Sequence, residues 1–223
     1  MKKENHQEKL YCLPYHWMMK GYLRVSMEFR NKIVMKYLSS CPGKNILDLG
    51  CGDGYFTAHL KNRLKEAYVV GADYYLRALR FARIMTNDAP YVATSAISLG
   101  FRKKCFDTVF LLDVIEHLSK EDREKALNQI VMTLKPGGII IITVPSKKLP
   151  AIPMHCDHFS PHDLKMLMRK HFAEVAITGC CLHLPILHKL TRFPIIWRII
   201  YFIIRECTPQ KAVTLIGYGK KNY

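Results

Sequence analysis

The sequence lacks the features that would place it in a specialised structural class. Its 223 residues contain no internal repeat and no low-complexity tract. Hydrophobic residues account for 49% and charged residues for 23%, values that argue against a disordered or fibrous protein. We therefore expect one folded domain over residues 1–223, with appendages near its two ends.

The eight cysteines lack the spacing of a metal site or of a disulfide framework. No C-x-x-C pair is present, and several cysteines lie inside apolar runs, where a small buried thiol is common. The first residues, MKKENHQEKLYC, are basic, but no apolar stretch follows them as it would in a secretory signal. These absences predict a cytoplasmic protein in a reducing compartment.

Acidic residues are scarce, since 18 Asp and Glu stand against 34 Lys and Arg. The basic excess is concentrated at the ends: residues 1–45 carry 9 basic and 3 acidic side chains, and residues 182–223 carry 7 and 1. Such ends suit a nucleic acid or an anionic lipid surface as a neighbour. The alternative is that these charges only favour solubility.

Apolar runs of strand length alternate with amphipathic stretches of helix length, which is typical of a parallel sheet with crossover helices. Strands are expected at 45–49, 67–72, 89–93, 106–112, 138–144, 175–179 and 212–218. Helices are expected near 22–40, 54–65, 75–86, 120–134 and 161–171. In K-P-G-G (135–138) the proline and the glycines should end a helix and open a buried strand. In S-P-H-D (160–163) the residue types of a capping box predict a helix start.

The segment ILDLGCGDGYFT, residues 46–57, places three glycines at alternate positions behind a short apolar run. A glycine-rich turn between a strand and a helix lets the backbone approach a ligand closely. The spacing of Gly50, Gly52 and Gly54 departs from the dinucleotide pattern G-x-G-x-x-G, and Asp48 precedes it. An acid at this position would repel a pyrophosphate but suits S-adenosylmethionine, which carries an ammonium and a sulfonium group.

A second acid follows the next predicted strand. Asp73 lies 19 residues after Gly54, about where an acid can accept hydrogen bonds from both ribose hydroxyls of an adenosine. Nicotinamide cofactors share this feature. Asp73 therefore favours S-adenosylmethionine only in combination with the glycine loop.

With these motifs the sequence resembles the class I S-adenosylmethionine-dependent methyltransferases, in particular their small-molecule and quinone branch. The resemblance runs from about residue 44 to 179 and resumes at the last strand, and it rests on LDLGCGDG, GADYY, FDTVFLLDVIEHL and LKPGGIIIITVP. It implies an α/β, Rossmann-like, doubly wound sheet of seven strands in the order 3-2-1-4-5-7-6, with the last strand antiparallel.

The resemblance implies S-adenosylmethionine as the cofactor. Asp48 and the glycines would lie against its methionine part, Asp73 would hold the ribose, and residues 113–114 would floor the site. Where the family has an acid followed by a small residue at the adenine edge, this sequence has Ser95 and Ala96, and a serine binds the adenine amino group more weakly than an anion does. The expected cofactor-binding residues are Asp48, Gly50, Cys51, Gly52, Gly54, Asp73, Tyr74, Ser95, Ala96, Asp113 and Val114.

Methyl transfer from a sulfonium needs an aligned nucleophile and, for some acceptors, a base. Two segments offer histidines: LDVIEHL contains His117, and HCDHFSPHDL contains His155 and His158. In related methyltransferases the second segment covers the acceptor pocket, so we expect His158, His117 and His155 as catalytic candidates. His158 has the alternative of a packed residue at the helix entry.

The resemblance leaves a metal open as an alternative. In quinone O-methyltransferases a D/E-x-x-E-H group, matched here by Asp113, Glu116 and His117, can hold a divalent metal near a catechol. In relatives without a metal the Glu-His pair supports the loop. We expect no metal in this protein.

The absence of certain motifs narrows the classes of methyl acceptor that we expect. No N-P-P-Y or D-P-P-Y follows the fourth strand, and the Pro-Cys and Thr-Cys pairs of cytosine-carbon chemistry are absent. We expect a methyltransferase acting by direct displacement on an O, N or C nucleophile of a small, lipophilic acceptor. The alternatives are an RNA methyltransferase that uses the basic ends, and a non-catalytic methyltransferase-like scaffold protein.

Two appendages are expected on the domain. One is an N-terminal helical part, residues 1–43, whose segment LPYHWMMKGYL mixes aromatic and basic residues. The other is an apolar and basic helical insertion at 182–207, too short to span a bilayer but suited to lie on an anionic membrane. A lipophilic acceptor met near a membrane surface would fit both. The alternative is that both segments pack on the domain or form a dimer contact, and the sequence does not give the oligomeric state.

Overall fold

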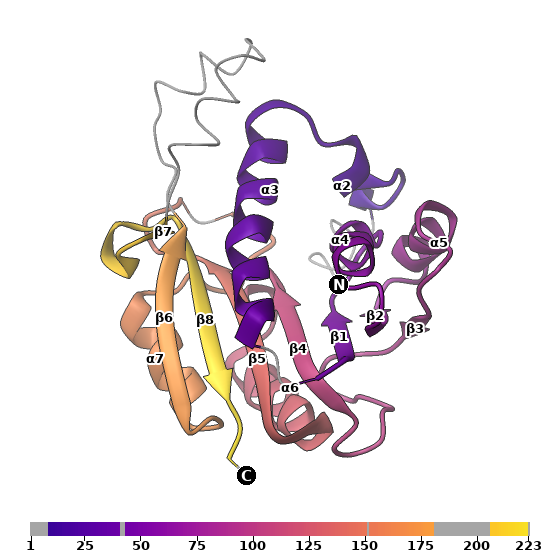
Figure 1. Cartoon of the computed structure of the whole chain (residues 1–223). Coiled ribbons are helices and arrows are strands. Elements are labelled where there is room, and N and C mark those ends of the chain that lie inside the picture. The colour runs from indigo at the N-terminus through magenta and orange to yellow at the C-terminus, as the bar shows by residue number, and fades with distance from the viewer. Residues whose placement is uncertain (1–8, 41–42, 151, 181–205, 223) are drawn as a thin grey trace.

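The computed structural model describes residues 9–40, 43–150, 152–180 and 206–222 (Figure 1). Its centre is a mixed sheet in the order β3-β2-β1-β4-β5-β8-β6-β7. The strands are β1 Asn45–Leu49, β2 Tyr68–Asp73, β3 Tyr91–Ala93, β4 Phe106–Leu112, β5 Leu134–Pro145, β6 Glu174–Cys180, β7 Glu206–Cys207 and β8 Thr214–Lys220. Strands β1 to β5 run parallel, and β8 is antiparallel to both β5 and β6.

This topology confirms the predicted order 3-2-1-4-5-7-6, because β8 is the seventh strand that the sequence predicts. The pair of residues in β7 extends the sheet beyond β6. The sequence places Glu206 and Cys207 at the end of the helical insertion 182–207, and this placement is wrong, since both residues are in a strand. Residues 182–205 of that predicted insertion lie outside the described residues.

Helices cover both faces of the sheet. They are α2 Tyr15–Met18, α3 Gly21–Lys36, α4 Tyr55–Arg63, α5 Leu76–Met85, α6 Lys120–Thr133 and α7 Pro161–Arg169, with short 3-10 turns η1 Tyr37–Ser40, η2 Ile115–His117 and η3 Pro209–Lys211. The helix predicted at 22–40 ends at Lys36 and continues as η1. Among the helices of the described residues, none combines the length and the apolar character that crossing a membrane would require.

The isoleucine run of β5 shows how one strand serves two cores. Ile139 and Ile141 face the core that the sheet forms with α3 and α4, whereas Ile140 and Ile142 face the core formed with α6 and α7. All four side chains are almost fully buried. Burial on both faces explains why this strand reads as a continuous apolar run instead of an alternating one.

Two boundary predictions have different outcomes. In S-P-H-D, Ser160 and Asp163 form the reciprocal capping box of α7, as predicted. In K-P-G-G, the helix already ends at Thr133, so Pro136 and the two glycines lie inside β5 and not before it. The register of β5 against β4 shifts between Phe106 and Thr108, which accommodates the proline and the glycines as an irregularity within the strand.

Candidate functional site

The glycine loop after β1 approaches its neighbours so closely that side chains are excluded. Gly50 has φ +81°, and a Cβ atom there would lie 2.2 Å from Cγ2 of Val114. The N–H groups of Gly50 and Cys51 both donate to the carbonyl of Ala72 in β2, at 2.7 and 3.0 Å. The loop is therefore fastened to the end of the neighbouring strand, with its backbone bare toward β4.

The next two glycines have other tasks. The N–H of Gly52 donates to Oδ2 of Asp73 at 2.8 Å. Gly54 has φ +79°, and a Cβ atom there would lie 2.7 Å from the hydroxyl of Tyr91 and 2.9 Å from Cβ of Ala82. Gly54 thus permits α4 to pack against α5, and it lines neither of the cavities described below.

Asp73, at the end of β2, organises the loop. Its Oδ1 accepts from the N–H of Tyr75 and its Oδ2 from the N–H of Gly52, both at 2.8 Å. The carboxyl is 6% exposed, and this burial raises its pKa. Each carboxylate oxygen has a second lone pair, so Asp73 can hold the loop and still accept a hydrogen bond from a ligand.

A cavity of about 400 Å³ opens beside this carboxyl, and we call it the Asp73 cavity. Its walls come from the glycine loop and from the ends of β1 to β4. The lining residues are Tyr11, Leu49, Gly50, Asp73, Tyr74, Tyr75, Thr94, Ser95, Ala96, Ile97, Asp113, Val114, His117, Leu118 and Met154. Of the eleven predicted cofactor residues, seven meet here: Gly50, Asp73, Tyr74, Ser95, Ala96, Asp113 and Val114.

The residues of the Asp73 cavity fit S-adenosylmethionine. Among the described residues that line it there is no Lys or Arg, which a pyrophosphate would need, whereas Asp73 offers a carboxylate to hydroxyl or cationic groups of a ligand. Gly50 lines the cavity with backbone alone, because Val114 occupies the space that a Cβ atom would need. Ser95 and Ala96 border the same cavity, so the adenine edge predicted from the sequence faces the ligand space.

Asp48 lies deeper in the site. It is 2% exposed, and its Oδ2 accepts a hydrogen bond from Oγ1 of Thr57 at 2.6 Å. Burial raises the pKa of Asp48 from 3.8 to about 7, although the bond from Thr57 and the charge of Arg30 lower it. The group is poised to ionise near neutrality, and a positive ligand nearby would favour the ionised form.

A second cavity of about 410 Å³ adjoins the first, and we call it the His155 cavity. Much of its wall is apolar, from Leu10, Met19, Leu23, Met27, Phe56, Leu112, Leu149 and Met154. Its polar lining includes Tyr15, His16, Arg30, Asp48, Asp113, Glu116, His117, His155 and Thr214. Tyr11, Gly50, Asp113, His117 and Met154 line both cavities, so the two spaces share a wall.

Asp113 is the most constrained residue of the shared wall. It has φ +54°, unusual for a residue with a side chain. Its Oδ1 accepts from Oγ1 of Thr143 in β5 at 2.7 Å, and its Oδ2 forms an ion pair with Nη1 of Arg30 from α3. The strained backbone is thus supported from two directions, and the carboxylate is turned to the junction of the cavities.

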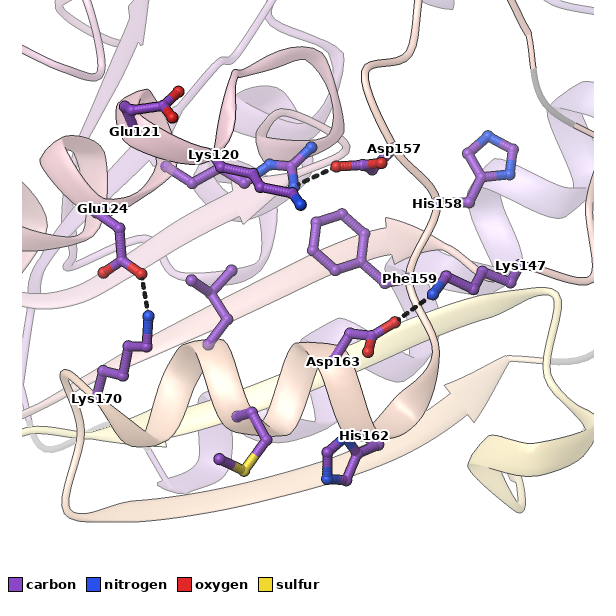
Figure 2. Close-up of a pocket in the computed structure, with 13 residues that line it drawn as sticks. Lys120, Glu121, Glu124, Lys147, Asp157, His158, Phe159, His162, Asp163 and Lys170 are labelled. Carbon is purple, nitrogen blue, oxygen red and sulfur yellow. Dashed lines mark hydrogen bonds and ion pairs between the residues drawn. The ribbon is translucent and has the colours of Figure 1, made fainter.

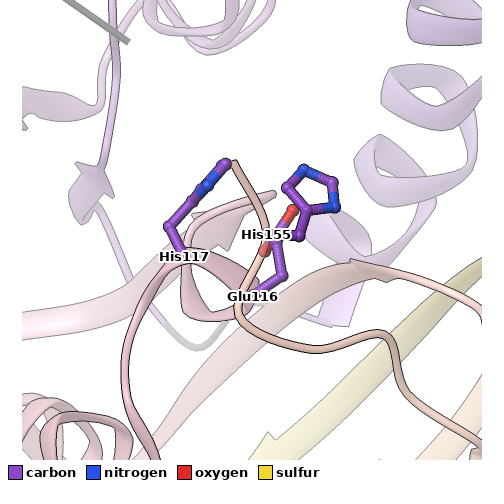
Figure 3. Close-up of side chains that lie close together, drawn as sticks. All are labelled: Glu116, His117 and His155. Atoms are coloured by element: carbon purple, nitrogen blue, oxygen red, sulfur yellow. The ribbon is translucent and has the colours of Figure 1, made fainter. Parts of the chain in front are cut away.

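Three groups that could hold a metal ion meet at the polar end of the His155 cavity. Glu116, His117 and His155 offer ligand atoms that all lie within 4.8 Å of one another (Figure 3). Glu116 is 1% exposed, its Oε2 has no hydrogen-bond partner among the described residues, and burial followed by the charge of Asp113 raises its pKa. Asp113, the remaining member of the metal alternative considered from the sequence, is instead engaged by Arg30 and Thr143.

The hydrogen bonds of the histidines determine which nitrogen of each ring is basic. A carbonyl can only accept, so His117 donates from Nδ1 to Met154 at 3.0 Å, and His158 donates from Nδ1 to Leu149 at 3.1 Å. Neutral His158 then accepts at Nε2 from Nδ1 of His155, at 2.9 Å. The basic nitrogen of His117 and of His155 is therefore Nε2.

His158 occupies a different position from the other two histidines. It lines neither the Asp73 cavity nor the His155 cavity, and it lies behind His155. Instead it borders a hollow of about 620 Å³ between α6 and α7 (Figure 2). Three ion pairs lie in the wall of this hollow, and in each pair the two charges neutralise one another. They are Arg123–Asp157 at 2.8 Å, Lys147–Asp163 at 2.7 Å and Lys170–Glu124 at 2.5 Å.

The sequence did not reveal several residues of the site. Tyr11 and Arg30 precede the first strand, where no motif marks them, and Thr143 lies within the motif LKPGGIIIITVP, from which no role for it was predicted. In the sequence, residues 13–23 are distinguished only by their mixture of aromatic and basic residues. The remaining predicted residues, Cys51 and Gly52, belong to the loop itself; Cys51 borders the His155 cavity.

Comparisons with known proteins agree with this geometry. Residues 47–142 match the family described as Methyltransferase domain. The demethylmenaquinone methyltransferase of Thermus thermophilus is 32% identical over 120 residues, which cover 52% of this chain and 53% of that protein. A tRNA (carboxymethyluridine(34)-5-O)-methyltransferase of Arabidopsis thaliana is 30% identical over 113 residues, covering 50% of this chain and 26% of that protein. The matched part thus spans about half, or less, of these relatives.

A solved structure extends the likeness to most of the fold. The N-methyltransferase NodS from Bradyrhizobium japonicum, in complex with S-adenosyl-L-homocysteine, superimposes with a TM-score of 0.66 at 17% identity, covering 89% of this chain and 88% of that one. Residues 47–142 therefore match the methyltransferase domain family, and the chain has the fold of S-adenosylmethionine-dependent methyltransferases.

Proposed function

We propose that this protein transfers a methyl group from S-adenosylmethionine, held in the Asp73 cavity, to a small, lipophilic acceptor held in the His155 cavity. The observation that carries the proposal is the shared wall: Gly50, Asp113 and His117 border both spaces. A donor in one cavity and a nucleophile in the other would meet at this wall without rearrangement of the fold. Such alignment supplies most of what a displacement at an activated methyl group requires.

The cofactor supplies the chemistry of an activated methyl group on a sulfonium. The chain's own part is to bind, orient and deprotonate. Asp73 would hold the ribose, Gly50 would lie against the methionine part, and Ser95 would lie at the adenine edge, since all three line the Asp73 cavity. The apolar lining of the His155 cavity excludes water from the acceptor and favours a lipophilic body.

His155 and His117 are the proposed bases. Both border the acceptor cavity, and their hydrogen bonds leave Nε2 as the basic nitrogen of each ring. His158 acts through His155 as a positioning residue, because its Nε2 holds the Nδ1–H of that ring and so determines the tautomer. For an acceptor hydroxyl, the proton would pass to Nε2 as the bond from the methyl carbon to oxygen forms and its bond to sulfur breaks.

An RNA acceptor is the second candidate, favoured by the basic charge of residues 1–45 and 182–223. The Arabidopsis relative named for a tRNA reaction supports it. Against it stands the apolar wall of the His155 cavity, since enzymes that act on a base read it by hydrogen bonds and stacking. A small lipophilic acceptor explains that wall better.

The test is incubation of the protein with methyl-labelled S-adenosylmethionine and a cell extract, followed by separation into lipid, small-molecule, RNA and protein fractions. We expect label in the lipid or small-molecule fraction. His155→Ala and His117→Ala should lose at least about tenfold in rate while still binding the cofactor. The matched control is His162→Ala, because His162 borders the hollow between α6 and α7 and neither of the two cavities. Label found only in RNA would replace the proposal with the second candidate.

A further inference from the structure

The segment before α3 is latched onto the glycine loop, and we call residues 9–19 the N-terminal strap. Its anchor is Asp53, a fully buried loop residue. Oδ2 of Asp53 accepts from the backbone N–H of His16 at 2.7 Å, and its Oδ1 lies 2.9 Å from Nδ1 of the same residue. Trp17 donates from Nε1 to the carbonyl of Asp53 at 2.9 Å.

Aromatic contacts add to the latch. The ring of Trp17 packs edge-on against Tyr55 at the start of α4, with 5.1 Å between centroids. Tyr11 packs against Tyr75 at the start of α5, with 5.9 Å between centroids. The strap therefore bridges the two helices whose N-termini flank the glycine loop, and α2 lies next to α4 (Figure 1).

Tyr11 is the point at which the strap enters the site. It lines both the Asp73 cavity and the His155 cavity. A Cβ atom on Gly52 would lie 2.8 Å from its hydroxyl, so only a glycine leaves room for it. Burial, followed by the charges of Asp73 and Asp53, raises the pKa of this hydroxyl, which keeps it neutral and able to donate near neutrality.

We propose that the N-terminal strap is an outer wall of the cofactor site, with Tyr11 as a positioning residue, and that its release from Asp53 sets the rate of cofactor exchange. This inference rests on the proposed function, since it concerns the same cofactor. A closed strap confines the ligand between Tyr11 and the loop backbone. An open strap removes that wall from both cavities at once, because Tyr11 borders both.

The proposal is tested by measuring how fast the full chain releases labelled S-adenosylmethionine after a chase with unlabelled compound. Trp17→Phe is the decisive variant, because Trp17 lines neither cavity and acts only through the latch. Loss of its hydrogen bond should speed release about fivefold, and His16→Ala, which removes a bond to a buried carboxylate, about tenfold or more. Met18→Ala, at an exposed strap position, should release at the wild-type rate.

Tyr11 needs a separate comparison. Tyr11→Phe keeps the ring against Tyr75 and should stay within about threefold of wild type, whereas Tyr11→Leu should speed release about tenfold. The melting temperature of each variant, measured without cofactor, reveals a merely structural effect. Release from Trp17→Phe and His16→Ala at the wild-type rate would overturn the strap proposal. Failure of the wild type to bind labelled cofactor at all would instead overturn the proposed function.

Discussion

Asp48 is a carboxyl group whose ionisation is set by its surroundings. Its burial at 2% exposure raises the pKa to about 7. A ligand with two positive groups stabilises the carboxylate, so binding and deprotonation are coupled. Asp48, which indicated a cationic ligand in the sequence, thus also predicts how the affinity for that ligand depends on pH.

We expect the affinity for S-adenosylmethionine to rise as the pH increases from about 6 to 8, because the proton must leave Asp48 for the carboxylate to form. Below pH 7 the affinity should fall by up to about tenfold for each pH unit. Calorimetry at pH 6 and pH 8, in buffers of different ionisation enthalpy, would measure both the affinity and the released proton. Asp48→Asn should bind more weakly and with a flat pH profile; a steep profile in that variant would assign the proton to another group.

The same pKa has a consequence for stability in the absence of ligand. Folding raises the pKa of Asp48 from 3.8 to about 7, so its contribution is complete below about pH 4 and is lost as the pH rises through 7. We expect Asp48→Asn, which stays neutral, to gain in free energy of unfolding relative to wild type between pH 5 and pH 8. Urea denaturation at the two pH values measures the difference. If the variant and the wild type differ in free energy of unfolding by the same amount at pH 5 and at pH 8, then Asp48 stays ionised in the folded protein at both pH values.

Elements bring these residues together, and the sequence predicts most elements well. Apart from β5 and the two-residue β7, which the sequence did not predict, the strands and the helices between them begin and end within two residues of the predicted bounds. Local chemistry is sufficient there: apolar runs, the glycine loop and the capping box of Ser160 act over a few neighbouring residues. The start of β5 could not be read in this way, because pairing with β4 overrides the local preference of Pro136.

The glycine loop has little tolerance for a side chain at its first position. In Gly50→Ala the new Cβ atom would lie 2.2 Å from Cγ2 of Val114. The alanine would also have to adopt the left-handed backbone conformation of Gly50, with φ +81°. We expect a loss of about 1–3 kcal/mol in the free energy of unfolding and loss of detectable cofactor binding. Gly100→Ala, where nothing lies within 4 Å, is the matched control for urea denaturation and calorimetry.

The segment with His155 and His158 leads directly into α7, whose N-cap is Ser160. The cap of this helix therefore helps to hold the segment in place. Ser160→Ala removes the side chain that accepts from the N–H of Asp163 at 3.1 Å, and about 1 kcal/mol of stability should be lost. Ser160→Asp can cap in the same manner and should restore most of it. Thermal unfolding of the two variants compares them; equal losses would show that the cap is not what stabilises this helix.

At the scale of the whole molecule, two cavities occupy one edge of the sheet, where the parallel strands end. Seven residues of the Asp73 cavity could be predicted because they belong to short motifs, each made of neighbouring residues. In the His155 cavity, Asp113 and His155 were candidates from the sequence, but their proximity to Arg30 was not predicted, since these residues meet only through the fold. His158 shows the same limit: its distance from His155 is short, but the sequence does not tell which of the two faces the cavity.

A ligand that binds only the folded protein must raise its unfolding temperature. With S-adenosyl-L-homocysteine at 100 times its dissociation constant, the stabilisation is about 2.7 kcal/mol, which for a chain of this size shifts the melting temperature by roughly 5–10 °C. Differential scanning fluorimetry over a ligand series measures it. NADH at the same concentrations is the control, and an equal shift with NADH would contradict the assignment of the Asp73 cavity.

The reversed direction of β8 has a consequence for which residues reach the His155 cavity. Because β8 runs against β5, its first residue, Thr214, arrives at the edge where the parallel strands finish, and there it borders the His155 cavity. Thr214 pairs with Cys180, the last residue of β6, and Cys180 pairs with Glu206. The ends of β6 and β7, Cys180 and Glu206, thus lie beside the strand residue that borders the His155 cavity, on the side of the sheet away from the glycine loop.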